Sequence, residues 1–335
     1  MKEIAMPAHY LITPASRDFP LLTVMSMTDD AVFRLFCLAR WPNTEGAPVC
    51  DRCNLPATGP HSRRRFRCLN CGRLFTVTSG TALAYLKLPL RLVLILVAQW
   101  AIAPKGRAAR YLSQSFGLNY RTVFSLCHKL RHAMTSDVVG QQIGGPGVEV
   151  EADGCYLGGH VRPTNWVINR RDRRFARNKS DKRWVVVVVR ERRPNGRTLV
   201  FVVKHERQGA ALIAKVVRPG SIIHADSHFA WLELDALYET KRINHEEAYS
   251  DGQACTNHAE SFFARLRRLE AEHHHIAGPY LLRYATEAAF REDQRRLSAA
   301  DATYLLLHLA LNSKPDREFK NYRDLKRRRR LSGQH

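Results

Sequence analysis

The chain has 335 residues, with 53 Lys and Arg against 31 Asp and Glu and a formal net charge of +22. This length allows two or three domains with sizeable cores, and the positive charge indicates a polyanionic partner, nucleic acid before an anionic membrane surface. The longest apolar run, residues 88–100, is broken by Pro89, Arg91 and Gln99, so it predicts a buried helix rather than a membrane span. The first twenty residues lack the basic start and apolar block of a secretory signal, and we expect a cytoplasmic protein.

The N-terminal segment, residues 1–45, predicts an arm followed by one helix. Residues 1–27 show little pattern and are expected to be extended. Residues 28–41 have helical periodicity, with Thr28 or Asp29 as the cap and Val32 and Phe36 on the inner face.

Residues 46–80 contain two Cys-x-x-Cys pairs. Fourteen residues separate Cys53 from Cys68, and the full set is Cys50, Cys53, Cys68 and Cys71. Four thiolates at this spacing predict one tetrahedral Zn²⁺ in a zinc ribbon, with the metal itself holding the small fold together. Between the pairs lies a basic strip that suits phosphate contacts through Arg63, Arg64 and Arg65, although a solvated surface would show the same charge.

Residues 81–134 predict helices that bind DNA. A short strand, a turn at Gly80 and a helix entered at Pro89 come first. Residues 105–134 then hold six Lys or Arg and no acidic residue, in two helices (107–116 and 120–132) joined at Gly117. This is the pattern of a helix-turn-helix, with Arg121 and Lys129 as DNA contacts, but helical hairpins that bind nothing are also common.

Residues 135–147 are rich in glycine and predict a linker, after which the pattern changes to strands. Expected strands cover 148–153, 183–192, 198–206 and 221–226, with a helix at 210–217 before the last. This order describes a mixed α/β sheet. The intervening loop, residues 160–183, has nine Lys or Arg against two Asp, which suits a phosphate backbone or a solvated loop.

Three acidic residues of this half form a candidate metal site. Asp153 and Asp226 end strands, and Glu260 lies on the amphipathic helix that follows. Acids on rigid neighbouring elements can hold Mg²⁺ or Mn²⁺ for phosphodiester chemistry, although acidic residues at strand ends are often only solvated. Asn257 shares the helix face of Glu260, and Arg267, two turns on, could hold the DNA backbone.

Two neighbours of Asp153 carry the same charge. Glu149 and Glu151 alternate with it, so all three side chains point to one face of the strand. Because three carboxylates on a buried face are costly, we expect at least one to be solvated or bound to metal.

These residues resemble a known family. The zinc-ribbon region RWPNTEGAPVCDRC…FRCLNCGRLFTVTSGT and the blocks VEADGCYLGG, SIIHADSHFAW and TNHAESFFARLRR are similar to those of bacterial insertion-sequence transposases. The resemblance covers roughly residues 28–296 and implies a DDE transposase with a ribonuclease-H-like catalytic domain and two Mg²⁺ ions. It identifies Asp153, Asp226 and Glu260 as the catalytic and metal-binding residues, with Asn257 beside them. Gly154 departs from the pattern, since the family often has a glutamate there.

The expected domains are therefore an arm and helix (1–45), a zinc ribbon (46–80), a helix-turn-helix region (81–134), a linker (135–147), a catalytic domain (148–300), and a C-terminal helix with a basic tail (301–335). The expected partners are double-stranded DNA, as terminal inverted repeats and as target, and a second copy of the chain, in a nucleoid-associated assembly with no membrane. A DNA-binding regulator without catalysis and a structure-selective nuclease remain alternatives.

Overall fold

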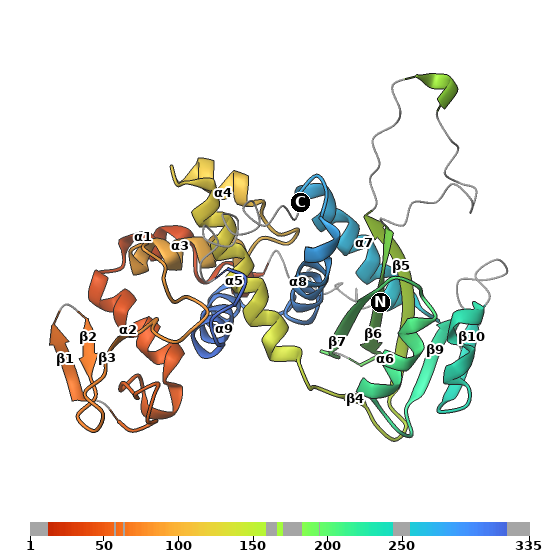
Figure 1. Cartoon of the computed structure of the whole chain (residues 1–335), viewed down its shortest axis with the longest axis horizontal. Helices are drawn as coiled ribbons and strands as arrows, with labels where there is room; N and C mark the ends of the chain where they lie inside the picture. The colour runs from red at the N-terminus through yellow and green to blue at the C-terminus, as the bar shows by residue number, and fades with distance from the viewer. Residues whose placement is uncertain are drawn as a thin grey trace, which may run out of the picture. The chain divides into compact units, whose positions relative to one another are not determined.

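The computed structural model describes residues 13–56, 58–62, 64–158, 166–169, 183–193, 195–243 and 255–319, with side-chain detail lacking at 58–62 and 158 (Figure 1). Most of the basic loop 160–183 and the tail 320–335 lie outside these residues, as does Arg63. The chain divides into two compact units, one of residues up to Asp137 together with those from Gln294, the other Val138–Asp293. Among the described residues, no helix combines the length and apolar character needed to cross a bilayer.

The first unit begins with helices around a small sheet. Its elements before the second unit are α1 (Leu21–Ser26), α2 (Asp29–Arg40), β1 (Thr58–Ser62), β2 (Arg65–Arg67), β3 (Leu74–Thr76), α3 (Leu90–Ala101), α4 (Ala109–Ser115) and α5 (Tyr120–Val138). Thr28 caps α2 by accepting the N–H of Ala31 at 3.2 Å, as predicted. The segment 1–27 is not simply extended, because α1 lies within it and buries Val24.

The predicted pair of helices is present, and its second member is longer than expected. Gly117 has a φ of +61°, the left-handed conformation that favours glycine, at the turn between α4 and α5. Helix α5 runs to Val138, into the predicted linker. Thr135 and Ser136 are compatible with this extension, because their hydroxyls donate to the carbonyls of Arg131 and His132 one turn back.

The C-terminal helix α9 (Ala299–Asn312) completes the first unit by packing on α2 and α3. The last carbonyl groups of a helix have no hydrogen-bond donor within the helix. Side chains of α9 donate to the last carbonyl groups of α2. Tyr304 donates to the carbonyl of Leu38 at 3.2 Å, and His308 and Asn312 donate to that of Ala39 at 2.8 and 3.0 Å. Residues far apart in the sequence thus form one unit.

The second unit is a mixed five-stranded sheet with helices on both faces, as the sequence predicted. The sheet order is β10 (Glu239–Ile243), β9 (Ile222–Asp226), β5 (Glu149–Gly158), β6 (Arg183–Glu191) and β7 (Thr198–Val203). Strands β5, β6 and β7 are antiparallel, whereas β9 is parallel to both β5 and β10. Strands β4 (Ile143–Gly144) and β8 (Val217–Arg218) form a separate parallel pair. This architecture is compatible with a ribonuclease-H-like transposase domain.

Two hydrophobic cores fix which side of the sheet each helix covers. The five valines of β6 alternate between them, residues 185, 187 and 189 toward α6 (Gln208–Val216) and residues 186 and 188 toward α7 (Asn257–Glu272) and α8 (Leu281–Asp293). Figure 1 shows these helices around the sheet. A strand buried on both faces reads as a continuous apolar run, which is why β6 was predictable.

Candidate active site and cysteine cluster

Asp153 and Asp226 lie on adjacent parallel strands. The ladder between β5 and β9 pairs Glu151 with His224, and each aspartate follows two residues later on its strand. Val150 and Ala152 of β5, like Ile223 and Ala225 of β9, belong to the core on the α6 side. Because side chains alternate along a strand, both aspartates point to the other face, which α7 covers.

Glu151 fixes the start of α7, the helix that carries Glu260. Its carboxylate is fully buried and accepts the backbone N–H of His258 at 2.8 Å and of Ala259 at 2.9 Å. These N–H groups belong to the first turn of α7 and therefore have no partner within the helix. They also lie at the positive end of the helix dipole, which favours an anion. Glu260 lies in that same turn, and its N–H donates to the carbonyl of Thr256 at 2.9 Å. Strand β5 therefore fixes the start of the helix that carries Glu260, and it does so through Glu151, two positions before Asp153.

Arg192 joins the other two carboxylates of β5. Its guanidinium pairs with Glu151 at 3.4 Å and with Glu149 at 2.9 Å, and Lys241 adds a contact to Glu149 at 3.4 Å. The Glu149 side chain is 37% exposed, whereas Glu151 is fully buried. Cations, N–H groups or solvent thus compensate the charges of Glu149 and Glu151. This agrees with the expectation that three carboxylates on one buried face would be costly without such partners.

Asp153 has a different environment, in which burial acts together with neighbouring acids. Burial raises the pKa of Asp153 to about 7 against the opposing hydrogen bond from the Gly154 N–H, and the charges of Asp226, Glu206 and Glu260 add to the rise. The Asp153 carboxylate accepts that N–H at 2.7 Å, and the Asp226 carboxylate accepts the N–H of His228 at 3.0 Å. An oxygen-only group of this kind suits Mg²⁺ or Mn²⁺.

The predicted DNA-contacting residues have different exposures. Arg65, Arg121 and Arg267 are exposed, and Arg267 donates to the Cys155 thiol at 3.0 Å. Asn257, predicted as part of the catalytic site, is also exposed. Arg64 pairs with Asp30 at 3.0 Å. Lys129 is only 3% exposed and its ammonium group donates to the carbonyl of Ala84, so its placement does not favour the DNA contact expected from the sequence.

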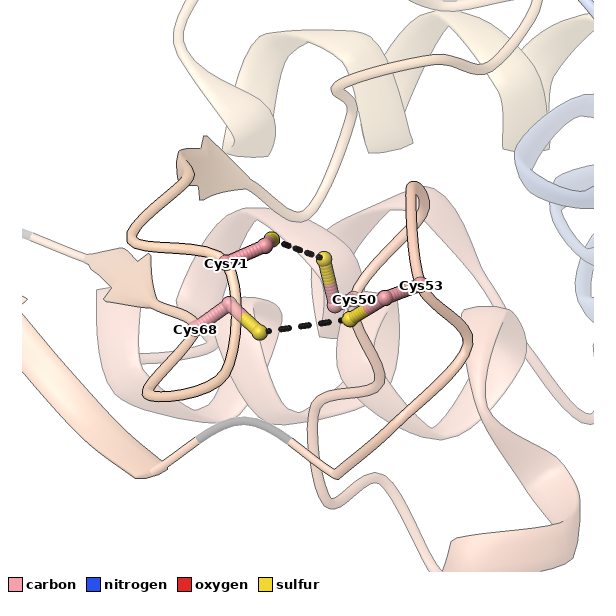
Figure 2. A group of neighbouring side chains, drawn as sticks. All are labelled: Cys50, Cys53, Cys68 and Cys71. Atoms are coloured by element: carbon pink, nitrogen blue, oxygen red, sulfur yellow. Dashed lines mark hydrogen bonds between the residues drawn. The ribbon is translucent and has the colours of Figure 1, made fainter.

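The four cysteines of the Cys-x-x-Cys pairs come together as predicted. Their sulfur atoms all lie within 4.8 Å of one another, which no other group of three or more His, Cys, Asp or Glu in the described part of the chain achieves with its ligand atoms. Figure 2 shows the sulfurs of Cys50 and Cys71, 3.6 Å apart, and of Cys53 and Cys68, 3.4 Å apart. The acidic group is therefore the looser of the two sites.

The two turns that carry the cysteines have the same backbone design. Cys50 donates its N–H to Leu55 and accepts that of Asn54, and Cys68 does the same with Arg73 and Gly72, at 2.9–3.0 Å. Asn54 and Gly72 have φ values of +55° and +69° at equivalent places. Two matching turns bring the four thiols together. This donor set and arrangement are consistent with a zinc ribbon.

We predict that Glu151→Gln lowers the free energy of unfolding by about 3 kcal/mol, because it removes the charge that Arg192 and the start of α7 face in a buried site. Urea unfolding would measure it. The matched control is Glu149→Gln on the same face of β5, for which its partial exposure predicts less than about 1 kcal/mol. Equal effects of the two substitutions would contradict the assigned role of Glu151.

The fold and the two clusters together define a chain with a mixed α/β domain bearing carboxylates and a separate Cys₄ unit. A family model described as the ISXO2-like transposase domain matches residues 143–293, which lie within the second unit. Over this segment the chain is similar to that transposase family, which confirms the resemblance to insertion-sequence transposases predicted from the motifs. Comparison with curated proteins and with solved structures gave no match.

Proposed function

We propose that the protein is a DDE transposase that cuts DNA at the terminal inverted repeats of an insertion sequence and joins the freed end to target DNA. The observation that carries the proposal is the coincidence of two results. Residues 143–293 match a transposase family, and within them Asp153, Asp226 and Glu260 come from β5, β9 and α7 to the same face of one sheet.

Asp153, Asp226 and Glu260 would hold the metal, Mg²⁺ or Mn²⁺. Bound there, the metal would activate the attacking oxygen and stabilise the leaving oxygen of the phosphodiester. The donor set fits such an ion, because it offers carboxylate oxygens whose mutual repulsion a cation would offset. Asn257, at the exposed start of α7, would orient the scissile phosphate, and Arg267, farther along α7, would neutralise a backbone phosphate.

The first unit would supply DNA binding. The Cys₄ cluster would hold Zn²⁺, and the helices α4 and α5 would act as a helix-turn-helix on the terminal repeats. Arg64, Arg65 and Arg121 would contact phosphates together with Arg63 of the same strip, in keeping with the net charge of +22. Two element ends must be cut in concert, so we propose that the active form on DNA is a dimer or a larger oligomer.

The test is a strand-transfer assay with Mg²⁺ or Mn²⁺, using duplexes that end in the inverted repeats flanking the gene and a supercoiled target. Wild type should give joined products that disappear when Asp153→Asn is used instead. Cleavage without joining would replace the proposal by a structure-selective nuclease. Tight binding to the repeats with no cleavage in either metal would replace it by a DNA-binding regulator.

A further inference from the structure

The chain leaves β9 at Asp226 and enters the short helix η6 (Phe229–Leu234), and we call residues 226–235 the Asp226 loop. One side of η6 is anchored in the core on the α6 side by its buried residues, Ala230, Trp231 and Leu234. The loop begins beside β10, because Asp226 pairs with Ile243 and the N–H of Ser227 donates to the Ile243 carbonyl at 2.9 Å. The direction in which the chain continues after Asp226 thus depends on contacts with β10.

Arg242 of β10 contacts this loop at its start, its middle and its end. The guanidinium donates to the backbone carbonyl of Asp226 at 3.0 Å and to that of Trp231 at 2.6 Å. It also pairs at 2.7 Å with the carboxylate of Asp235, the residue at which η6 ends. The hydroxyl of Thr240, two residues before Arg242, donates to the same carboxylate. A single side chain on the edge strand therefore joins both ends of the Asp226 loop.

The residue type at position 242 suits this task. The Arg242 side chain is only 21% exposed, and backbone carbonyls that are shielded from water need a donor. A guanidinium presents its N–H groups in a rigid plane, so it bonds to several acceptors while holding them at fixed relative positions. A lysine would keep the charge but not this planar arrangement of donors.

The Asp226 loop also determines where the Asp226 carboxylate lies. That carboxylate accepts the N–H of His228, a residue of the same loop, at 3.0 Å. A shift of the loop backbone would therefore move the acid together with its hydrogen-bond partner. Arg242 contacts the backbone carbonyl of Asp226, so it acts on the acid through the position of the chain.

We propose that Arg242 is a positioning residue of the active site, which fixes the backbone at Asp226 and thereby the place of its carboxylate. The inference rests on the proposed function, because it concerns one of the three acids to which that function assigns the metal. Arg242 serves Asp226 as Glu151 serves Glu260, since each is a charged side chain of a neighbouring strand that bonds to the backbone near the acid.

The charge of Arg242 and its hydrogen bonds predict opposite effects on metal binding. A nearby positive charge repels a bound cation, so removal of the charge alone would leave metal affinity unchanged or raise it. Loss of the hydrogen bonds should lower metal affinity, because a carboxylate that is no longer held in place meets the ion less well. A role in stability alone would leave the affinity of the folded protein unchanged. The direction of the change in affinity therefore distinguishes these roles.

The first experiment measures Mn²⁺ binding by isothermal titration calorimetry, with the full folded chain and with the cysteine cluster saturated with Zn²⁺ beforehand. Arg242→Gln should weaken Mn²⁺ binding at least about tenfold. The matched control is Arg207→Gln, which removes a 74% exposed arginine paired with Glu233 of the same loop and should not weaken binding. Equal losses in the two variants would overturn the proposal, because they would trace the effect to the charge of the loop's surroundings.

Asp153→Asn separates the inference from the proposed function, and it should abolish Mn²⁺ binding. If it does while Arg242→Gln binds Mn²⁺ as tightly as wild type or more tightly, the inference on Arg242 fails and the proposed site stands. If Asp153→Asn binds Mn²⁺ like wild type, the proposed site itself fails.

The second variant, Arg242→Lys, covers the case in which Arg242→Gln folds poorly. It keeps the positive charge and most of the aliphatic stem, and it loses the planar set of donors. Mn²⁺ binding should therefore be weaker than in wild type, although the charge is unchanged. Wild-type affinity in Arg242→Lys would overturn the proposal, because the hydrogen bonds of the guanidinium would then have no influence on the site.

Discussion

Glu260→Gln should reduce strand transfer by roughly a thousandfold, because it removes the charge of a carboxylate that we propose binds the metal while leaving α7 in place. Glutamine has almost the same helix propensity as glutamate, and the loss of a favourable charge at the helix start costs at most about 1 kcal/mol. The start of α7 is held by Glu151, which the substitution does not touch. A gel assay of joined product, with wild type and variant at equal folded concentration, measures the effect.

The control for this prediction is Glu272→Gln, which changes the last residue of the same helix and should retain wild-type activity. If both variants lose activity equally, the effect comes from α7 as a whole and not from metal binding. A Glu260→Gln protein that still joins DNA would remove this residue from the site.

Asp153→Asn provides a second control that separates activity from stability. Folding raises the pKa of Asp153 from 3.8 to about 7, so the ionised group destabilises the metal-free fold increasingly as the pH rises from about 4 to 7. Urea unfolding at pH 8 without metal should therefore show that Asp153→Asn is at least as stable as wild type. The same variant should lose strand transfer in the assay with metal. Loss of stability would show that the aspartate supports the fold instead.

The sequence predicted the elements whose pattern is local. The valine run of β6, the capped start of α2 and the cysteine spacing each define an element from neighbouring residues alone. Strand β10 was missed because it is a short edge strand of mostly polar residues in which only Ile243 is buried. Its place in the sheet comes from pairing with β9, which no local pattern indicates.

The same distinction explains the candidate site. Asp153, Asp226 and Glu260 stand in recognisable motifs, so the sequence indicated them. Glu206 was predicted at the end of a strand over 198–206, which was wrong there because β7 ends at Val203 and the polar residues after it form a turn. Gly154 looked only like a departure from the family pattern. A Cβ atom at Gly154 would overlap the Glu206 carboxylate, a contact between distant residues that the sequence alone does not reveal. The role of Glu151 is of the same kind, since burial on β5 and the first-turn N–H groups of α7 meet only in the folded chain.

Removal of zinc should unfold the two cysteine turns and the small sheet of β1, β2 and β3. Strands β2 and β3 have three residues each, of which only Phe66 and Phe75 are buried. Zinc bound to four thiolates contributes about 10–16 kcal/mol of apparent binding free energy at pH 7, and this energy becomes folding energy when the site does not exist in the unfolded chain. Chelation should therefore cost far more stability than loss of any single side-chain contact.

Cys68→Ser tests this with its matched control, Cys127→Ser, since Cys127 is also buried in the first unit but lies on α5 away from the cluster. Metal analysis should give one Zn²⁺ per chain for wild type and for Cys127→Ser, and much less than one for Cys68→Ser. Amide hydrogen exchange should show lost protection at residues 65–76 in Cys68→Ser and in chelator-treated wild type, with the sheet of the second unit unchanged. Full zinc content in Cys68→Ser would mean that the four sulfurs do not bind one ion, because a tetrahedral thiolate site cannot lose a ligand and keep its affinity.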